Sequence, residues 1–324
     1  MSNFVANSLS EDGSKLVGVD ASGKIHAWSI AKTVPQSYRS ACVSLVNPSI
    51  TLKGAKIMVE FVDRRHFIVI AGSLGLVIDS DHLFLHDSAL DSADRDPPYL
   101  LYRVGLPCVA TCISSGDGSV LIGGDHGLVY VLGSNGHIID TFRVDISESI
   151  SAVRLVGSHS LILGTDRGQI SIYDIMKRKI TSSWRSAAPS PSVSWIAVDP
   201  KANWFCATVN SNQGQKSWLV TGSTRTLVQV FESSASEGEL RRCEFAQLSS
   251  KGLCVISSSA TKSGISVRSL DLSSEPRSMH DGEGGIADIA RTARGDILAI
   301  CGTNRPIQIL SSSALGIIRQ LVVE

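Results

Sequence analysis

The chain has 324 residues, of which 43% are hydrophobic and 19% are charged, with 30 basic and 30 acidic side chains. A net charge of zero excludes a bulk electrostatic attraction to nucleic acid or to an anionic membrane, although a local patch stays open. The apolar composition indicates that a chain of this length buries most of its surface.

The first residues, MSNFVANSLSEDG, contain neither the basic n-region nor the apolar h-region of a signal peptide. The longest apolar runs, such as Phe67–Ile70, are too short to span a bilayer. The number of cysteines, seven, is odd, and no acceptor for N-glycosylation occurs. Both features favour a reducing compartment, the cytosol or the nucleus.

A strand-like apolar run followed by a tight turn and an alternating strand occurs seven times along the chain. The residues that close these runs are Gly18, Gly72, Gly123, Gly164, Thr208, Ser257 and Gly302. From Gly18 to Gly302 the six steps average about 47 residues, close to the length of a propeller blade. The sequence therefore predicts an all-β fold, a seven-bladed β-propeller with four antiparallel strands per blade, and one domain over residues 1–324.

The first blade is predicted to begin with an inner strand at Phe4–Leu9, and the seventh to end with an outer strand at Leu315–Val323. With both blades supplied by their own strands, the ring is expected to close by side-chain packing alone. In the third blade the expected strands are Val109–Ser114, Val120–Gly123, Leu128–Leu132 and Ile138–Val144. Five residues of second strands are expected to be buried between blades: Leu121, Ile122, Leu161, Ile162 and Leu163.

Two irregular segments interrupt the repeat, the acidic Asp87–Pro98 and the polar Asn210–Lys216. Long loops on a rigid fold are common places for partners to bind. The candidate partner-binding residues are Asp91, Asp94, Arg95, Asp96, Tyr99, Asn212, Gln213 and Lys216.

Segment Gly18–Lys24 matches the pattern of a phosphate-binding loop, G-x4-G-K. However, Ile25 stands where a Ser or Thr would hold magnesium, and an alternating strand follows instead of a helix. A β-hairpin turn explains the segment, and a nucleotide site is not expected.

Segment Asp81–Asp87 places His82 and His86 four residues apart, on one face if the segment is a strand. Only two neutral ligands are present and no cysteine is near, so a solvated loop edge is the favoured interpretation. The sequence has no Cys-x-x-Cys and no G-x-S-x-G, and the cysteines within strands are interpreted as small buried hydrophobes. We therefore expect no metal, no cofactor and no catalytic site.

The repeat is that of a degenerate WD-repeat protein. The third strands end in pairs such as Trp28-Ser29 and Tyr173-Asp174, and Trp-Asp is absent. A hairpin aspartate is kept at Asp20, Asp125 and Asp166, but the Gly-His before the inner strand is missing. The buried Asp–His–Ser–Trp network of WD repeats is therefore expected to be incomplete.

In its layout the chain resembles the family of subunit six of the THO complex, which couples transcription to messenger-RNA packaging and export. The resemblance rests on the first blade at residues 8–30, the Pro-Pro-Tyr at 97–99, the tryptophans Trp195 and Trp204, and the terminal strand from Leu315. It implies a non-catalytic scaffold of a nuclear assembly that docks coiled-coil THO subunits through loops on one face. The fourth blade lacks the Trp-Asp-x-Arg ending of that family.

Two alternatives remain open at this stage. One is a WD-type adaptor of another complex, such as a ubiquitin-ligase substrate receptor or a trafficking coat, in the nucleus or the cytoplasm. The other is an enzyme or a small-ligand binder, which would need a deep channel lined by convergent ionisable residues. Direct binding of nucleic acid is not expected, because Arg64-Arg65 and Lys177–Lys179 are short basic runs without neighbouring exposed aromatics.

Overall fold

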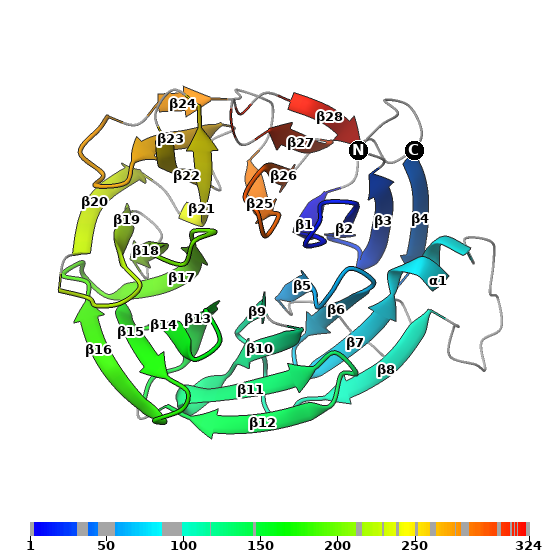
Figure 1. Ribbon diagram of the computed structural model, residues 1–324, viewed down its shortest axis with the longest axis horizontal. Helices are drawn as coiled ribbons and strands as arrows, with labels where there is room; N and C mark the ends of the chain where they lie inside the picture. The colour runs from blue at the N-terminus through cyan, green and yellow to red at the C-terminus, as the bar shows by residue number, and fades with distance from the viewer. Residues whose placement is uncertain are drawn as a thin grey trace.

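The computed structural model is a ring of seven antiparallel sheets around a central axis, a seven-bladed β-propeller as the sequence predicts (Figure 1). This fold is consistent with a WD-repeat protein. The structure describes residues 3–30, 38–44, 56–85, 99–116, 118–144, 147–211, 216–228, 230–237, 240–249, 252–259, 264–275, 277–279, 285–302, 306–311, 313, 315 and 317–321.

Each blade consists of four strands that are consecutive in the chain, numbered here from the axis outward. Blades 1 to 4 comprise β1 Phe4–Leu9, β2 Lys15–Asp20, β3 Lys24–Ile30, β4 Tyr38–Ser44; β5 Ile57–Phe61, β6 His66–Ala71, β7 Leu74–Asp79, β8 Leu100–Gly105; β9 Cys112–Gly116, β10 Ser119–Gly123, β11 Leu128–Gly133, β12 Ile138–Arg143; and β13 Ile150–Val156, β14 Ser160–Thr165, β15 Gln169–Asp174, β16 Lys179–Arg185. Blades 5 to 7 comprise β17 Pro191–Val198, β18 Trp204–Ser211, β19 Lys216–Ser223, β20 Val230–Glu237; β21 Leu240–Leu248, β22 Gly252–Ser259, β23 Ile265–Ser269, β24 Arg277–Met279; and β25 Ile286–Arg291, β26 Ile297–Gly302, β27 Ile307–Ser311, β28 Ile317–Leu321. The helical elements are α1 Ser80–Leu85 and the 3-10 turn η1 Asp125–Gly127.

The inner strands β1, β5, β9, β13, β17, β21 and β25 surround the axis (Figure 1). Because every blade repeats the same strand order, all inner strands begin on one face of the ring and end on the other. We call these the entry face and the exit face. Within a blade, the hairpin between the second and third strands then lies at the entry face, and the connection between the third and fourth strands lies at the exit face.

The buried apolar residues of the described chain form seven clusters, one between each pair of neighbouring blades. Strand β14 shows how one strand serves two of them. Leu161 and Leu163 pack against blade 3, while Ile162 between them packs against blade 5. The side chains of a strand alternate between its two faces, so a second strand with apolar neighbours on both sides must be apolar throughout.

The five second-strand residues that the sequence assigns to these interfaces are buried, Leu121 to 3% exposure and the other four completely. The strand cysteines Cys112, Cys206, Cys254 and Cys301 are buried and unpaired in disulfides, as expected of small hydrophobes.

The inner strand of blade 3 begins later than predicted, at Cys112 and not at Val109. Val109 is 57% exposed, and the backbone N–H of Ala110 donates to Gly72 of blade 2 at 2.9 Å. The residues before Cys112 therefore belong to the crossing between blades. A local β pattern does not distinguish this crossing from a strand.

The segment around His82 is a helix, which corrects the interpretation of Asp81–Asp87 as a strand or loop edge. The carboxylate of Asp79, the last residue of β7, accepts hydrogen bonds from the N–H groups of Asp81 at 2.9 Å and His82 at 3.2 Å. This is the contact of a helix N-cap, and it starts α1 directly after the strand. His82 Nδ1 lies 2.8 Å from the same carboxylate, and His86 is outside the described residues.

The phosphate-loop pattern at Gly18–Lys24 is the hairpin between β2 and β3, as expected. Gly23 has a φ of +85°, a conformation that glycine adopts without strain. The carboxylate of Asp20 accepts from the N–H groups of Ser22 and Lys24 and lies 3.0 Å from His26 Nε2. His26 in turn stacks on Trp28, so this hairpin has a local Asp–His–Trp contact although the Gly-His of WD repeats is missing.

Blades 1 and 7 meet without a shared strand, as predicted, since each sheet contains only its own four strands. Phe4, Leu16 and Trp28 pack there against Ile307 and Ile309. In the part of the chain that the structure describes, no helix is long and apolar enough to cross a membrane.

Leu163→Ala should lower the free energy of unfolding by about 2 to 5 kcal/mol, because it leaves a cavity between blades 3 and 4. Denaturant unfolding measures this, with Ile139→Ala as control, since Ile139 is 61% exposed on the outer strand β12. A loss below about 0.5 kcal/mol for Leu163→Ala would contradict its place in the core.

Amides of blades 1 and 7 should exchange their hydrogens faster than those of blades 3 and 4. Among the described residues, blades 1 and 7 share no strand and are not joined by consecutive strands, so local opening of their junction should cost least. Hydrogen exchange followed by mass spectrometry tests this, and slower exchange in blades 1 and 7 would refute it.

Candidate functional site

Six of the eight candidate partner-binding residues, Asp91, Asp94, Arg95, Asp96, Asn212 and Gln213, lie outside the described residues. Tyr99 is half-buried against the core between blades 1 and 2, and burial raises its pKa. Its carbonyl accepts a hydrogen bond from the N–H of Asp79 at 2.9 Å. Lys216 is exposed at the first position of β19. Their role in binding stays a prediction.

The segment Asn210–Lys216 is shorter as a loop than the sequence suggests, because β18 continues to Ser211. Asn210 is buried and its amide donates to Ser194 Oγ and to the Leu240 carbonyl, both at 2.8 Å. Its Oδ1 accepts from Ser217 Oγ at 2.6 Å. Asn210 therefore ties blade 5 to blade 6, and a polar residue in a turn-like sequence is here part of the core.

The two irregular segments leave the ring on opposite faces. Segment 86–98 connects α1, which follows β7, to β8, a connection between third and fourth strands at the exit face. Segment 212–215 connects β18 to β19, a hairpin at the entry face.

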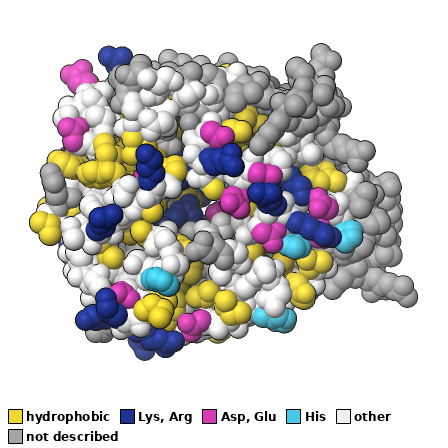
Figure 2. Space-filling view, viewed as in Figure 1, with side chains coloured by type: hydrophobic (Ala, Val, Ile, Leu, Met, Phe, Trp, Pro, Cys, Tyr) yellow, Lys and Arg dark blue, Asp and Glu magenta, His cyan; other side chains and the backbone are white. Residues whose placement is uncertain are grey.

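The most concentrated set of charged side chains lines the central channel, a cavity of about 500 Å³. Figure 2 shows a hollow at the centre of the ring with basic side chains inside it and acidic ones beside it. The charged residues of its wall between the two mouths are Lys56, Glu60, Arg154, Arg242, Glu244, Asp288 and Arg291. All seven come from inner strands or the residue directly before one.

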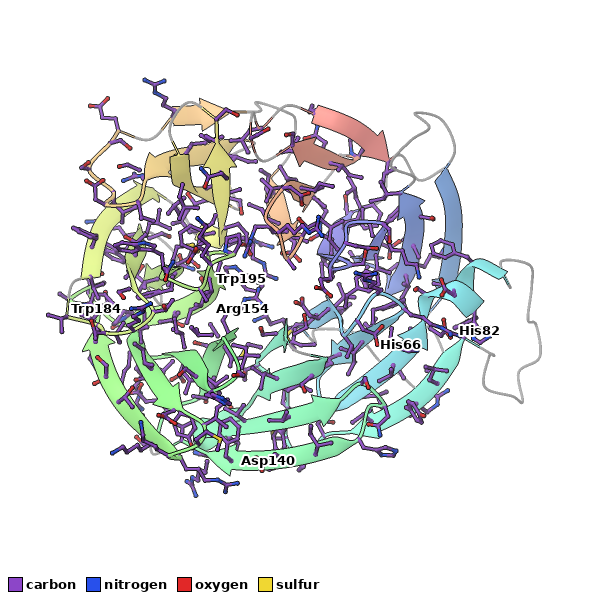
Figure 3. The ribbon with its side chains drawn as sticks, in the orientation of Figure 1. His66, His82, Asp140, Arg154, Trp184 and Trp195 are labelled. Carbon is purple, nitrogen blue, oxygen red and sulfur yellow. The ribbon has the colours of Figure 1, made fainter. Side chains whose placement is uncertain are left out.

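The indole of Trp195 lies between two arginines, one from each neighbouring blade. The guanidinium carbon of Arg154 is 4.2 Å from the indole centroid, and that of Arg242 is 3.6 Å from it. Trp195 Nε1 donates to the Cys243 carbonyl at 3.0 Å. Both Trp195 and Arg154 point toward the axis (Figure 3). Blades 4, 5 and 6 thus meet in a single stack.

Two ion pairs continue this stack into blade 7. Arg242 Nε lies 2.6 Å from Asp288 Oδ1, and Asp288 Oδ2 accepts from the backbone N–H of Asn7 in blade 1 at 2.9 Å. Arg291 Nε donates to Glu244 Oε2 at 3.0 Å, while its Nη2 donates to the Val198 carbonyl of blade 5 at 2.6 Å. Arg291 Nη1 is buried with no hydrogen-bond partner among the described residues.

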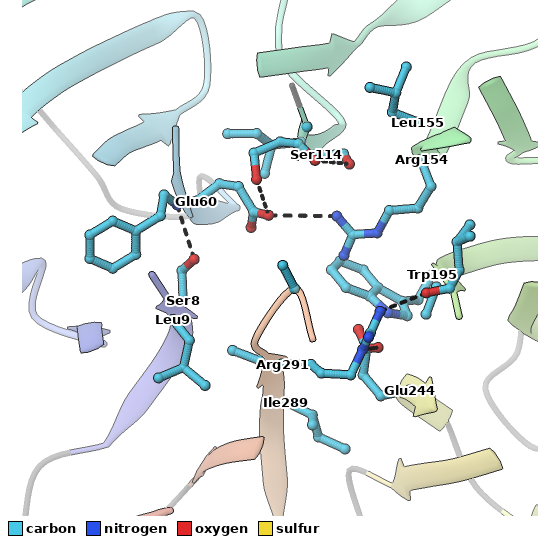
Figure 4. A pocket seen from close by; sticks show the side chains of 18 of the residues that line it. Ser8, Leu9, Glu60, Ser114, Arg154, Leu155, Trp195, Glu244, Ile289 and Arg291 are labelled. Atoms are coloured by element: carbon cyan, nitrogen blue, oxygen red, sulfur yellow. Dashed lines mark hydrogen bonds and ion pairs between the residues drawn. The ribbon is translucent and has the colours of Figure 1, made fainter. Parts of the chain in front are cut away.

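Glu60 faces Arg154 across the channel (Figure 4). Glu60 Oε1 lies 3.8 Å from Arg154 Nη1 and accepts a hydrogen bond from Ser115 Oγ at 2.9 Å. Burial raises the pKa of Glu60, and Asp288 adds to the rise, while Arg154 and the Ser115 hydrogen bond oppose it. The carboxyl of Glu60 is therefore held closer to neutral than an exposed glutamate.

Lys56 stands at the entry end of the channel, where it is open to the channel space but surrounded by inner strands. Its ammonium donates to the Thr111 carbonyl at 2.8 Å. Burial lowers the pKa of Lys56 and the positive charge of Arg242 lowers it further, while Asp288 opposes the change. Among the described residues no carboxylate lies within ion-pair distance of Lys56.

Three hydroxyls at the entry end join successive blades in the same way. Thr111 Oγ1 lies within hydrogen-bonding distance of the Gly123 carbonyl at 2.8 Å and of the Ile150 carbonyl of blade 4. Ser151 bridges to Val193 of blade 5 at 2.5 Å, and Ser194 bridges to Leu240 of blade 6 at 3.4 Å. Each hydroxyl thus satisfies a carbonyl at the edge of the next inner strand.

A deep channel lined by ionisable residues is what a small-ligand binder requires, but the sequence alone did not identify the residues of this channel. A usable signal existed for two of them, since Glu60 in β5 and Arg154 in β13 are each the only charged residue of an inner strand that is otherwise mostly apolar. A charged residue in such a strand is rarely buried unless it is paired. The sequence does not show which of these residues pair, because the pairs form between different blades.

The channel suits binding better than proton transfer or nucleophilic attack. Its three carboxylates between the mouths are engaged by arginines, and burial raises the pKa of the Cys112 thiol, which keeps it protonated. The described residues contain no group of three or more His, Cys, Asp or Glu side chains arranged to hold a metal ion. Propeller folds are typically non-catalytic.

Comparisons with known proteins add no family to this geometry. No protein-family model matches the sequence, and no curated protein is significantly similar to it. The fold fits a scaffold or adaptor that contacts other proteins.

Asp288→Ala should lower the free energy of unfolding by about 3 to 5 kcal/mol, because it leaves Arg242 buried without its carboxylate. The matched control is the double variant Arg242→Met with Asp288→Leu, which removes both charges and should cost less than the single change. Denaturant unfolding of the three proteins checks this. If Asp288→Ala cost less than about 1 kcal/mol, the pair would not hold blades 6 and 7 together.

Proposed function

We propose that the chain is a non-catalytic scaffold of a nuclear messenger-ribonucleoprotein assembly, similar in role to subunit six of the THO complex. The observation that carries the scaffold role is the mutual pairing of the channel arginines and carboxylates. It holds blades 4 to 7 together around the axis as a rigid support. The placement in a messenger-RNA packaging and export assembly is supported by the resemblance of the sequence layout to that family.

A rigid ring favours protein partners because its binding loops lose little freedom when a partner docks. The partners proposed are the coiled-coil subunits of a THO-type complex. A generic adaptor in another assembly, such as a ubiquitin-ligase receptor or a trafficking coat, is the alternative, with the cytoplasm as its alternative location.

Affinity purification of the tagged full chain followed by mass spectrometry separates these possibilities. Co-purification of coiled-coil THO subunits, with a nuclear signal in fluorescence microscopy, is the result expected. Co-purification of cullin or coat subunits in their place would overturn the proposal in favour of the adaptor.

Replacing residues 87–98 or residues 212–215 with a short Gly-Ser turn should leave folding intact and weaken pull-down of the partner subunits. Because the two segments leave on opposite faces, the variant with the larger loss identifies the docking face. The 212–215 replacement stops short of Asn210, whose buried hydrogen bonds hold blade 6. Circular dichroism verifies the fold of both variants.

The matched control for these loop variants is Ile138→Ser with Ile139→Ser, on the exposed outer strand of blade 3. Equal pull-down by both loop variants and the wild type, with a loss only for this control, would show that the outer edge of the ring binds the partner instead.

A further inference from the structure

The charges of the channel are distributed unevenly along its axis. At the exit end the wall carries Glu11, Asp63 and Asp199. At the entry end it carries Lys56 and, one level further in, the pair Arg242–Asp288. Because Arg242 and Asp288 balance each other, the net charge at the entry end is that of Lys56, whereas the exit end carries three carboxylates.

The carboxylates at the exit end are largely used by the protein itself. Asp63 accepts from the N–H groups of Arg65 at 2.7 Å and His66 at 2.8 Å, and Asp199 accepts from those of Asn203 and Trp204. These contacts hold the turns that follow the inner strands. They do not reach the basic side chains at the entry end.

Among the described residues, Lys56 is the cation of the channel wall that forms no ion pair with a carboxylate. Its ammonium contacts a neutral carbonyl, that of Thr111, and two of its three N–H donors remain. The other three cations, Arg154, Arg242 and Arg291, each face a carboxylate. Lys56 is also repelled by Arg242, which contributes to the lowered pKa of Lys56.

We propose that the entry half of the channel binds a compact small-molecule oxyanion, a phosphate- or carboxylate-bearing compound, held by Lys56 and Arg242. An anion there compensates the charge of Lys56 and relieves its repulsion by Arg242. Walls of low polarisability strengthen the attraction relative to a surface site. The cavity of about 500 Å³ lies within the size range of small-ligand sites, and the seven surrounding inner strands leave no room for a folded partner.

The neighbouring groups favour this charge as well. Deeper in the channel, Glu60 faces Arg154 and accepts a hydrogen bond from Ser115 Oγ, so its charge is balanced within the protein. The hydroxyls of Thr111, Ser151 and Ser194 are already bound to carbonyls and keep the mouth in shape. The proposed anion site does not depend on the proposed scaffold role, so an experiment that refutes one leaves the other unaffected.

The test uses the full chain with pyrophosphate and citrate as probes, against sodium chloride of matched ionic strength. Thermal unfolding and isothermal titration calorimetry are measured together. One or both anions should bind saturably and raise Tm by at least about 2 °C, because a ligand of the folded state stabilises it by mass action. Pyrophosphate alone indicates a phosphate ligand, and citrate alone a carboxylate ligand.

Lys56→Met should weaken the binding by at least about tenfold, because it keeps the length of the side chain and removes the charge. Lys24→Met is the matched control, since Lys24 is exposed on the entry face at the hairpin of blade 1 and makes no ion pair within the described chain. Binding to this variant should equal that to the wild type.

The proposal is overturned if neither anion gives a saturable signal with the wild type, or if Lys56→Met and Lys24→Met bind equally well. Should Lys56→Met fail to fold, the intrinsic fluorescence of the wild type gives a second measurement, with Trp195→Phe as reference. Trp195 lies against Arg242, so a saturable change that is lost in Trp195→Phe supports the site, and an unchanged signal refutes it.

Discussion

The stack of Arg154, Trp195 and Arg242 is the contact on which the centre of this propeller depends. Each arginine comes from a different neighbour of the blade that supplies the tryptophan, so the indole fixes the spacing of three blades at once. A guanidinium over an indole contributes about 0.5 to 2 kcal/mol, the larger values where water is excluded. The planar faces allow only one stacking order, which makes the contact specific as well as favourable.

The ion pairs around this stack extend it but add less to stability than their distances suggest. Desolvation of a buried pair such as Arg242–Asp288 cancels much of its attraction. Its effect is on specificity, since a blade displaced along the axis would leave both charges buried and unpaired. Asp288 also receives the N–H of Asn7, so the same carboxylate fixes the axial position of blade 1 relative to blade 7. This matters at the junction that no covalent link crosses.

The apolar layers between the blades supply most of the stabilisation, and the hydroxyl bridges act where those layers end. Three hydroxyls lie at the entry ends of successive junctions, and each contacts a backbone carbonyl of the next blade. They belong to Thr111, Ser151 and Ser194. The arginine contacts cover the junctions from blade 4 to blade 7. The two systems overlap at blades 4 to 6, so that part of the ring is held by both. Function is proposed at the edges of this rigid part, in the loops and at the channel mouth.

Local patterns in the sequence were sufficient for the blade count, the second strands and the hairpins. Strand β14 is covered on both faces, and its sequence therefore contains the apolar run Leu161, Ile162 and Leu163. Gly23 indicates a turn because glycine adopts a positive φ without strain. Both signals lie within a few residues of chain. The start of β9 and the start of α1 were not predictable in this way, since they depend on a hydrogen bond to Gly72 in another blade and on the use of Asp79 as a helix cap. The loops chosen as candidate sites were identified by their length, but only the strand order placed them on opposite faces. The partners of Arg154, Trp195, Arg242 and Asp288 were decided by the tertiary structure alone, because these residues come from four different blades and meet only when the ring has closed around its axis.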